Sequence, residues 1–118
     1  MAVFGFQKAR EEIRRRLSEI FEYETRDPRL SMITVIDVRL SKDMRYATVF
    51  VSNANLAHQD DEVTAVLKEH SGFFRTKLSK RIELRHTPEL RFEIDTIEDH
   101  AQRIDMLLRG ESHPTDPA

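Results

Sequence analysis

The residues of this sequence best suited to bind a charged ligand are an aromatic ring and several cations at helical spacing. Phe73, Lys77 and Lys80 fall at positions i, i+4 and i+7, and Arg81 lies beside them. Side chains at this spacing share one face of an α-helix. They form a candidate surface for a polyanion. A solvated helix face with Phe73 tucked into the core would give the same pattern, and the residues alone leave both interpretations open.

Basic residues cluster in two blocks, although the 118-residue chain carries a formal net charge of -2. Residues 1–16 have a net charge of +3 and residues 71–91 of +4, whereas residues 17–70 carry -4 and residues 92–118 carry -5. If the fold brings both basic blocks to one side, a polyanionic partner is compatible with the pI of 6.2. Charge spread over a solvated surface is the alternative.

A second group of residues is acidic and could in principle hold a divalent metal for a hydrolytic nuclease. It consists of Asp95, Glu98, Asp99 and His100. Acidic residues in the first turn of a helix are also expected from capping and the helix dipole alone. The remaining histidines, His58, His70, His86 and His113, show no ligand spacing. We therefore expect no metal site.

Other catalytic patterns are absent from the sequence. It contains no cysteine and no Gly-x-Ser-x-Gly turn, so nucleophilic catalysis has little support. Gly5, Gly72 and Gly110 are the only glycines, and they stand too far apart for a loop that cradles phosphate. Nucleotide hydrolysis is therefore not expected.

The first half of the chain predicts a helix followed by a β-hairpin. The helix is expected over about 7–23, with an apolar stripe that includes Ile13, Leu17 and Ile20. Alternating side chains predict strands over 33–40 and 45–52, with Ile36, Val38 and Leu40 on one face of the first.

The second half predicts two helical segments, a strand and a further helix. One helix begins near Asp60, and we expect a break at Gly72 before a second segment. Alternation over 90–94 predicts a third strand, and residues 96–109 keep helical spacing. The tail 111–118 is expected to be disordered.

Length and composition indicate one domain that folds without a disulfide bond or a structural metal. A hydrophobic content of 39% in 118 residues allows a single core. The lack of cysteine favours a reducing cytoplasm, and no apolar run is long enough for a signal peptide or a membrane helix. The absence of a sustained exposed apolar pattern predicts a monomer.

Several stretches, taken in order, carry a resemblance to a known family. They are Arg26-Asp27-Pro28-Arg29-Leu30, Val38-Arg39-Leu40-Ser41-Lys42-Asp43 leading into Ala47-Thr48-Val49-Phe50-Val51, Gly72-Phe73-Phe74-Arg75 with Lys80-Arg81-Ile82, Thr87-Pro88-Glu89-Leu90-Arg91-Phe92, and Arg103-Ile104-Asp105 with Leu107-Leu108. Together they resemble ribosome-binding factor A, and the match extends over nearly the whole chain.

This resemblance implies an α+β fold made of a single type II KH-like domain over 1–110. Its order is helix, strand, strand, helix, glycine break, helix and strand, with a short C-terminal helix, and the helices pack on a three-stranded mixed sheet. In this family an Ala-x-Gly break joins the two central helices. His70, Ser71 and Gly72 stand at the corresponding positions here, so histidine replaces the alanine.

The resemblance also implies a function. It predicts a bacterial ribosome assembly factor that is not an enzyme and needs no cofactor. Such a factor binds the free 30S subunit and its 16S rRNA, and it assists late maturation and 5′-end processing of that RNA, with a role in cold adaptation. Other assembly factors, assembly GTPases among them, are further implied partners.

Binding of ribosomal RNA favours cations on a rigid face with an aromatic residue among them. On this basis the expected main surface consists of Phe73, Arg75, Lys77, Lys80, Arg81 and Arg85, with Arg10, Arg14 and Arg15 as a second surface. The alternative is a protein-interaction module that docks a partner through the hairpin edge or the acidic C-terminal region.

Overall fold

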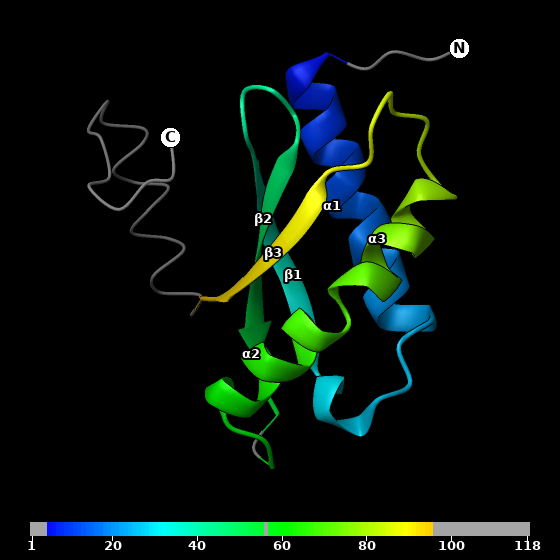
Figure 1. Ribbon diagram of the computed structural model, residues 1–118. Coiled ribbons are helices and arrows are strands. Elements are labelled where there is room, and N and C mark those ends of the chain that lie inside the picture. Colours follow the sequence, from blue (N-terminus) through cyan, green and yellow to red (C-terminus); the bar gives the residue numbers. More distant parts are fainter. Residues whose placement is uncertain (1–4, 56, 96–118) are drawn as a thin grey trace, which may run out of the picture.

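Helices and strands follow one another along the chain in the order that the sequence predicts (Figure 1). The computed structural model describes residues 5–55 and 57–95. In this range lie α1 (Phe6–Tyr23), the short 3-10 helix η1 (Pro28–Leu30), β1 (Ile33–Leu40), β2 (Tyr46–Asn53), α2 (Asp60–Glu69), α3 (Ser71–Ser79) and β3 (Glu89–Ile94). The C-terminal helix and the tail 111–118 that we expected lie outside the described residues.

The three strands form one mixed sheet in the order β1-β2-β3. β1 and β2 pair antiparallel as a hairpin, whereas β2 and β3 pair parallel, with Tyr46 opposite Glu89 and Val51 opposite Ile94. The connection between the two parallel strands contains α2 and α3. This confirms the predicted α+β class with helices packed on a three-stranded mixed sheet.

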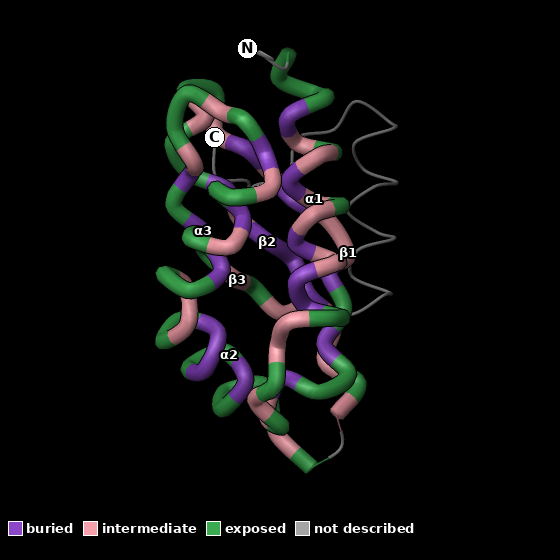
Figure 2. Tube along the Cα trace, turned by 90° about the vertical axis from the view of Figure 1, so that its right-hand side faces the viewer, coloured by how far each residue is buried: buried purple, intermediate pink, exposed green. Residues whose placement is uncertain are grey.

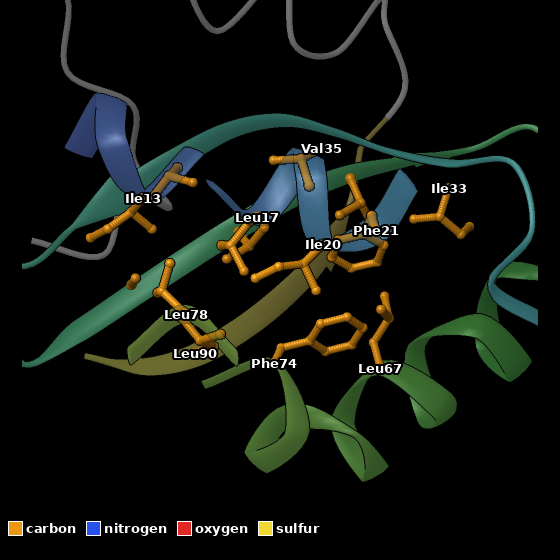
Figure 3. Packing of buried hydrophobic residues seen from close by; sticks show 14 of the residues in the cluster. Ile13, Leu17, Ile20, Phe21, Ile33, Val35, Leu67, Phe74, Leu78 and Leu90 are labelled. Atoms are coloured by element: carbon orange, nitrogen blue, oxygen red, sulfur yellow. The ribbon is translucent and has the colours of Figure 1, made fainter. Parts of the chain in front are cut away.

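The helices cover one face of the sheet and bury a single apolar cluster against it (Figures 1 and 2). Figure 3 shows the side chains of α1, α3 and the strands converging between the layers. Phe21 of α1 stacks on Phe74 of α3 with ring centroids 4.5 Å apart, and Phe92 of β3 lies 5.5 Å from Phe74. Each fully buried aromatic or aliphatic side chain contributes roughly 1.5–3 kcal/mol through removal from water. This packing fixes where α3 sits.

One strand face differs from the prediction. A β-bulge shifts the register of β1 between Val35 and Asp37, so Ile36 has no partner of its own on β2. Ile33 and Val35 face the core before the bulge, and Val38 and Leu40 face it afterwards. The expectation that Ile36 shares the buried face is therefore wrong, because the extra residue reverses the alternation.

The break between the two central helices falls at His70, the first of the three expected break residues, and not at Gly72 itself. α2 ends at Glu69, His70 is the single residue between the helices, and Gly72 is already inside the first turn of α3. The backbone of His70 leaves the helical region, at φ -95° and ψ 11°, and this one residue makes the bend. Gly72 does not occupy the left-handed region, so the bend does not depend on its conformational freedom.

None of the helices in the described part of the chain combines the length and hydropathy of a membrane-spanning segment.

Candidate nucleic-acid interface

The outer face of α3 carries an aromatic ring with a cation above it. Phe74 and Leu78 are fully buried on the inner face, so the helical spacing turns Phe73 and Lys77 outward. Phe73 is 40% exposed, and the ammonium group of Lys77 lies 5.6 Å from the centroid of its ring. The structure therefore brings these two predicted site residues together on one surface.

A carboxylate from α1 lies against this cationic face. Glu24, the C-cap residue directly after α1, pairs with the guanidinium of Arg81 and lies 3.5 Å from the ammonium nitrogen of Lys77. The hydrogen bond from Arg81, with a smaller effect of Lys77, lowers the pKa of Glu24. Two of the predicted cations are thus held in place and partly neutralised.

The other three cations of the predicted main surface do not pair with Glu24. They are Lys80, Arg85 and Arg75. Lys80 and Arg85 are exposed, and among the described residues neither makes a salt bridge. Arg75 instead donates two hydrogen bonds, of 3.1 and 2.9 Å, to the carbonyl oxygen of Thr87. Its guanidinium therefore fastens the loop that precedes β3, although its side chain remains at the surface.

The arginines of the second predicted surface are paired within or beside α1. Arg10 reaches Asp37 of β1 at 2.9 Å. Arg14 pairs with Glu11 at 3.1 Å and Arg15 with Glu12 at 2.7 Å, and these hydrogen bonds lower the pKa of both glutamates. Three cations of this second predicted surface are thus engaged by carboxylates of α1 and β1.

The junction between α2 and α3 is linked to the segment that follows α1. Nε2 of His70 lies 3.4 Å from a carboxylate oxygen of Asp27, and the hydroxyl of Ser71 donates to the carbonyl of Leu90 at 2.9 Å. Gly72 has nothing within 4 Å of the position where a Cβ would stand. The predicted break residues are thus anchored on both sides, and Gly72 faces open space.

Asp27 holds together several segments of the site, although the sequence does not mark it as a site residue. Its carboxylate accepts from the backbone N–H of Arg29 at 2.9 Å and from the Arg29 guanidinium at 2.8 Å. These hydrogen bonds from Arg29, with a smaller one from His70, hold the pKa of Asp27 well below its usual range. An Asp-Pro pair is typical of a turn, but no local pattern indicates that His70, 43 residues away, would contact it.

A pocket of about 310 Å³ opens between the end of α1, η1 and the junction of α2 and α3. It is lined by Glu24, Thr25, Arg26, Asp27, Leu30, His70, Phe73 and Phe74. Phe74 and Leu30 are buried and Phe73 is exposed, so the pocket has an apolar floor and an aromatic wall. Among its lining residues, Phe73 and His70 belong to the predicted set.

The described residues contain no group of acidic and histidine side chains suited to a metal ion. Asp95 of the candidate acidic cluster is buried at the end of β3, and its backbone N–H donates to Val51 at 2.7 Å. Glu98, Asp99 and His100 lie outside the described residues.

Comparison with known proteins gives one consistent result. Residues 6–108 match the family model of ribosome-binding factor A. A ribosome-binding factor A from Clostridium botulinum is 45% identical over 102 residues, which cover 84% of this chain and 87% of that protein. A relative from Clostridium perfringens is 41% identical over 110 residues and covers 92% of this chain and 95% of its own length.

Solved structures agree with the sequence comparison. The crystal structure of ribosome-binding factor A from Thermus thermophilus superimposes with a TM-score of 0.70 at 28% identity, covering 76% of this chain and 94% of that one. A homology model of the Thermus thermophilus protein, fitted into the cryo-EM map of its complex with the 30S subunit, gives a TM-score of 0.60 at 28% identity, covering 72% and 89%.

Proposed function

The chain belongs to the ribosome-binding factor A family, and on this premise we propose that it is a non-enzymatic assembly factor that binds the free 30S ribosomal subunit. It contacts the 16S rRNA of that subunit and assists its late maturation, including processing of the 5′ end. The observation that carries the proposal is the likeness to a family member placed in a complex with the 30S subunit.

The outer face of α3 supports a direct contact with RNA. Ribosomal RNA offers phosphates, ribose hydroxyls and unpaired bases, which favour cations and aromatic rings on a rigid support. Phe73 and Lys77 lie together on a helix whose other face is locked into the core. Lys80 and Arg85 extend the positive charge beyond them. We propose that this surface, with Arg81, forms the main contact.

The second candidate function is a module that docks a protein partner without touching RNA. Two large apolar side chains favour it, because Tyr23 is 72% exposed and Met32 is 64% exposed. Met32 also adopts a positive φ of 64°, a conformation that non-glycine residues rarely occupy. A docking site of this kind would place the partner near the end of α1 and the start of β1.

Co-sedimentation tests the proposed function. The purified protein is centrifuged with free 30S subunits, free 50S subunits and joined ribosomes at two salt concentrations. We expect selective binding to free 30S subunits that weakens as salt rises, because each phosphate contact releases counterions. Binding that ignores salt would favour the docking module, and no binding to any ribosomal particle would contradict the proposal.

A role in maturation needs a separate readout. In bacteria that lack their own member of the family, expression of this protein should lower the fraction of 16S rRNA with an unprocessed 5′ end. Primer extension on RNA from free 30S subunits measures that fraction. An unchanged fraction, with the protein present on 30S subunits, would contradict the processing role while leaving subunit binding intact.

A further inference from the structure

The pocket between the end of α1, η1 and the α2/α3 junction has features that the contact with phosphates does not explain. We propose that this pocket, named here the Phe73 pocket, takes one unpaired RNA base, which stacks on the ring of Phe73. The proposal rests on the proposed function, because it specifies how the α3 surface holds RNA. It concerns single-stranded or looped-out nucleotides.

The size and lining of the Phe73 pocket suit one small, largely apolar group. Its volume of about 310 Å³ lies at the lower end of the range for small-ligand sites, about 300–1,000 Å³. Phe74 is fully buried and Leu30 is only 4% exposed, so the side chains beneath the pocket are apolar, are held by the core and present little surface of their own. Phe73 keeps 40% of its surface exposed at the wall, although an aromatic ring would gain by being covered.

The charges around the pocket are arranged for the flanking phosphates. The two acidic lining residues are already countered, Glu24 by Lys77 and Arg81 and Asp27 by Arg29. Arg26 lines the pocket and is exposed, and in the described parts of the chain it forms no salt bridge. Lys80 lies further along the Phe73 and Lys77 face of α3. A strand whose base enters the pocket can therefore place its phosphates against Arg26 at the pocket or against Lys77 beside the ring of Phe73.

The polar groups of the pocket favour stacking over readout of the base identity. Oδ1 of Asp27 accepts two hydrogen bonds from Arg29, and Oδ2 accepts another from Arg29 and lies close to His70. The hydroxyl of Thr25 donates to the carbonyl of Ile20 at 3.2 Å. Few donors and acceptors remain to discriminate between base edges, so the pocket should accept any of the four bases.

A nucleobase accounts for these observations better than an apolar side chain of a protein partner does. An apolar side chain would use the floor and the ring of Phe73, but it would leave Arg26 and Lys80 without anionic partners. A nucleotide uses the ring and the cations together, because its base and its phosphate are covalently joined.

Fluorescence anisotropy with two short probes tests the proposal. One probe is the labelled five-nucleotide RNA AACAA, and the other is an abasic ribose-phosphate chain of the same length. For the full-length protein we expect the RNA to bind about 5- to 100-fold more tightly than the abasic chain. Phe73→Ala should abolish this preference, and Phe73→Leu should abolish most of it because leucine keeps apolar volume without a planar ring. Phe73→Tyr should retain it.

Lys80→Ala is the matched control. It should weaken both probes by the same factor and leave their ratio unchanged, because it removes a phosphate contact and no stacking surface. Circular dichroism of each variant verifies that the fold is kept. Phe73 is partly exposed, so we expect all variants to fold.

Three results would overturn the base pocket. They are equal binding of the two probes by the unmodified protein, an unchanged preference in Phe73→Ala, and no binding of the RNA probe.

If 30S co-sedimentation persists in those cases, the proposed function stands without the base pocket. If Phe73→Ala loses 30S binding while the unmodified protein binds both probes alike, a protein side chain fills the pocket instead. A base preference without 30S binding would contradict only the proposed function.

Discussion

At the scale of single residues, Glu24 determines how much positive charge the α3 surface presents. Its side chain is 25% exposed and lies between Lys77 and Arg81. Glu24 follows Ile20 and Phe21 at the spacing of one helical turn, so it lies on the same side of α1 as these buried residues. This is why its side chain reaches α3. A carboxylate so placed orients the two cations but also reduces their attraction for phosphate.

Replacing Glu24 with glutamine should therefore tighten RNA binding. We expect Glu24→Gln to lower the Kd for the RNA pentanucleotide about two- to five-fold at low salt, because Lys77 and Arg81 gain net charge at nearly constant shape. Glu22→Gln is the control, since Glu22 is exposed and forms no ion pair among the described residues. Anisotropy titrations measure both. A weaker affinity in Glu24→Gln would show that orienting the cations matters more than freeing them.

Asp27 makes the fold sensitive to acid. Its pKa is held well below the usual range by hydrogen bonds from Arg29, so the folded state resists protonation that the unfolded state accepts. The stability from this residue is complete above the ordinary carboxyl pKa, about 4, and is lost as pH falls further. The lowered pKa of Glu24 acts in the same direction.

Urea denaturation at several pH values tests this linkage. The free energy of unfolding should fall as pH drops from about 5 to about 3, and Asp27→Asn should be less stable at pH 7 with a flatter dependence. Asp61→Asn serves as the control, because Asp61 is exposed in the first turn of α2 and has no hydrogen-bond partner among the described residues. A pH dependence in Asp27→Asn as steep as in the unmodified protein would contradict the role assigned to Asp27.

At the scale of elements, apolar periodicity was sufficient to predict the helices and strands that lie within residues 5–95, in their order along the chain. The stripe of α1 places its end at Tyr23, as expected, because burial of one helix face is a local property. Which residues of β1 face the core was not predictable in the same way. The bulge beside Ile36 depends on how β1 pairs with β2. Val35 and Ile36 are both apolar and adjacent, so the sequence of the strand alone does not tell which of the two faces the core.

The candidate site was predictable only in part for a related reason. Helical spacing grouped Phe73 with Lys77, which the structure places together. The ion pairs that modify the site join residues far apart in sequence, such as Arg10 with Asp37 and Lys77 with Glu24. Surface cations have many possible partners, so tertiary packing decides which carboxylate each one meets.

The junction of α2 and α3 gives a prediction at this scale. Gly72 lies in the first turn of α3, outside the left-handed region and with open space around its Cβ position. Gly72→Ala should therefore raise the free energy of unfolding by about 0.5 kcal/mol, because alanine loses less backbone entropy on folding. Thermal and urea unfolding measure the change. A loss of stability would contradict the open surroundings of this residue.

At the scale of the whole molecule, packing of the helices on one sheet face gathers several cations at one place on the surface. The chain is acidic overall, yet the outer face of α3 and the Phe73 pocket carry Arg26, Lys77, Lys80 and Arg81 against two countered carboxylates. A local positive field of this kind can steer a polyanion in spite of the net charge.

The central claim is that this face of α3 binds the 30S subunit, and charge reversal tests it most directly. Arg26→Glu with Lys80→Glu is compared with Lys42→Glu with Arg45→Glu, which makes the same charge change on the hairpin between β1 and β2. Co-sedimentation with free 30S subunits is measured for both double variants. We predict that the first pair weakens binding by at least about tenfold and that the second changes it by less than about twofold. Equal losses in both variants, or no loss in the first, would contradict the account.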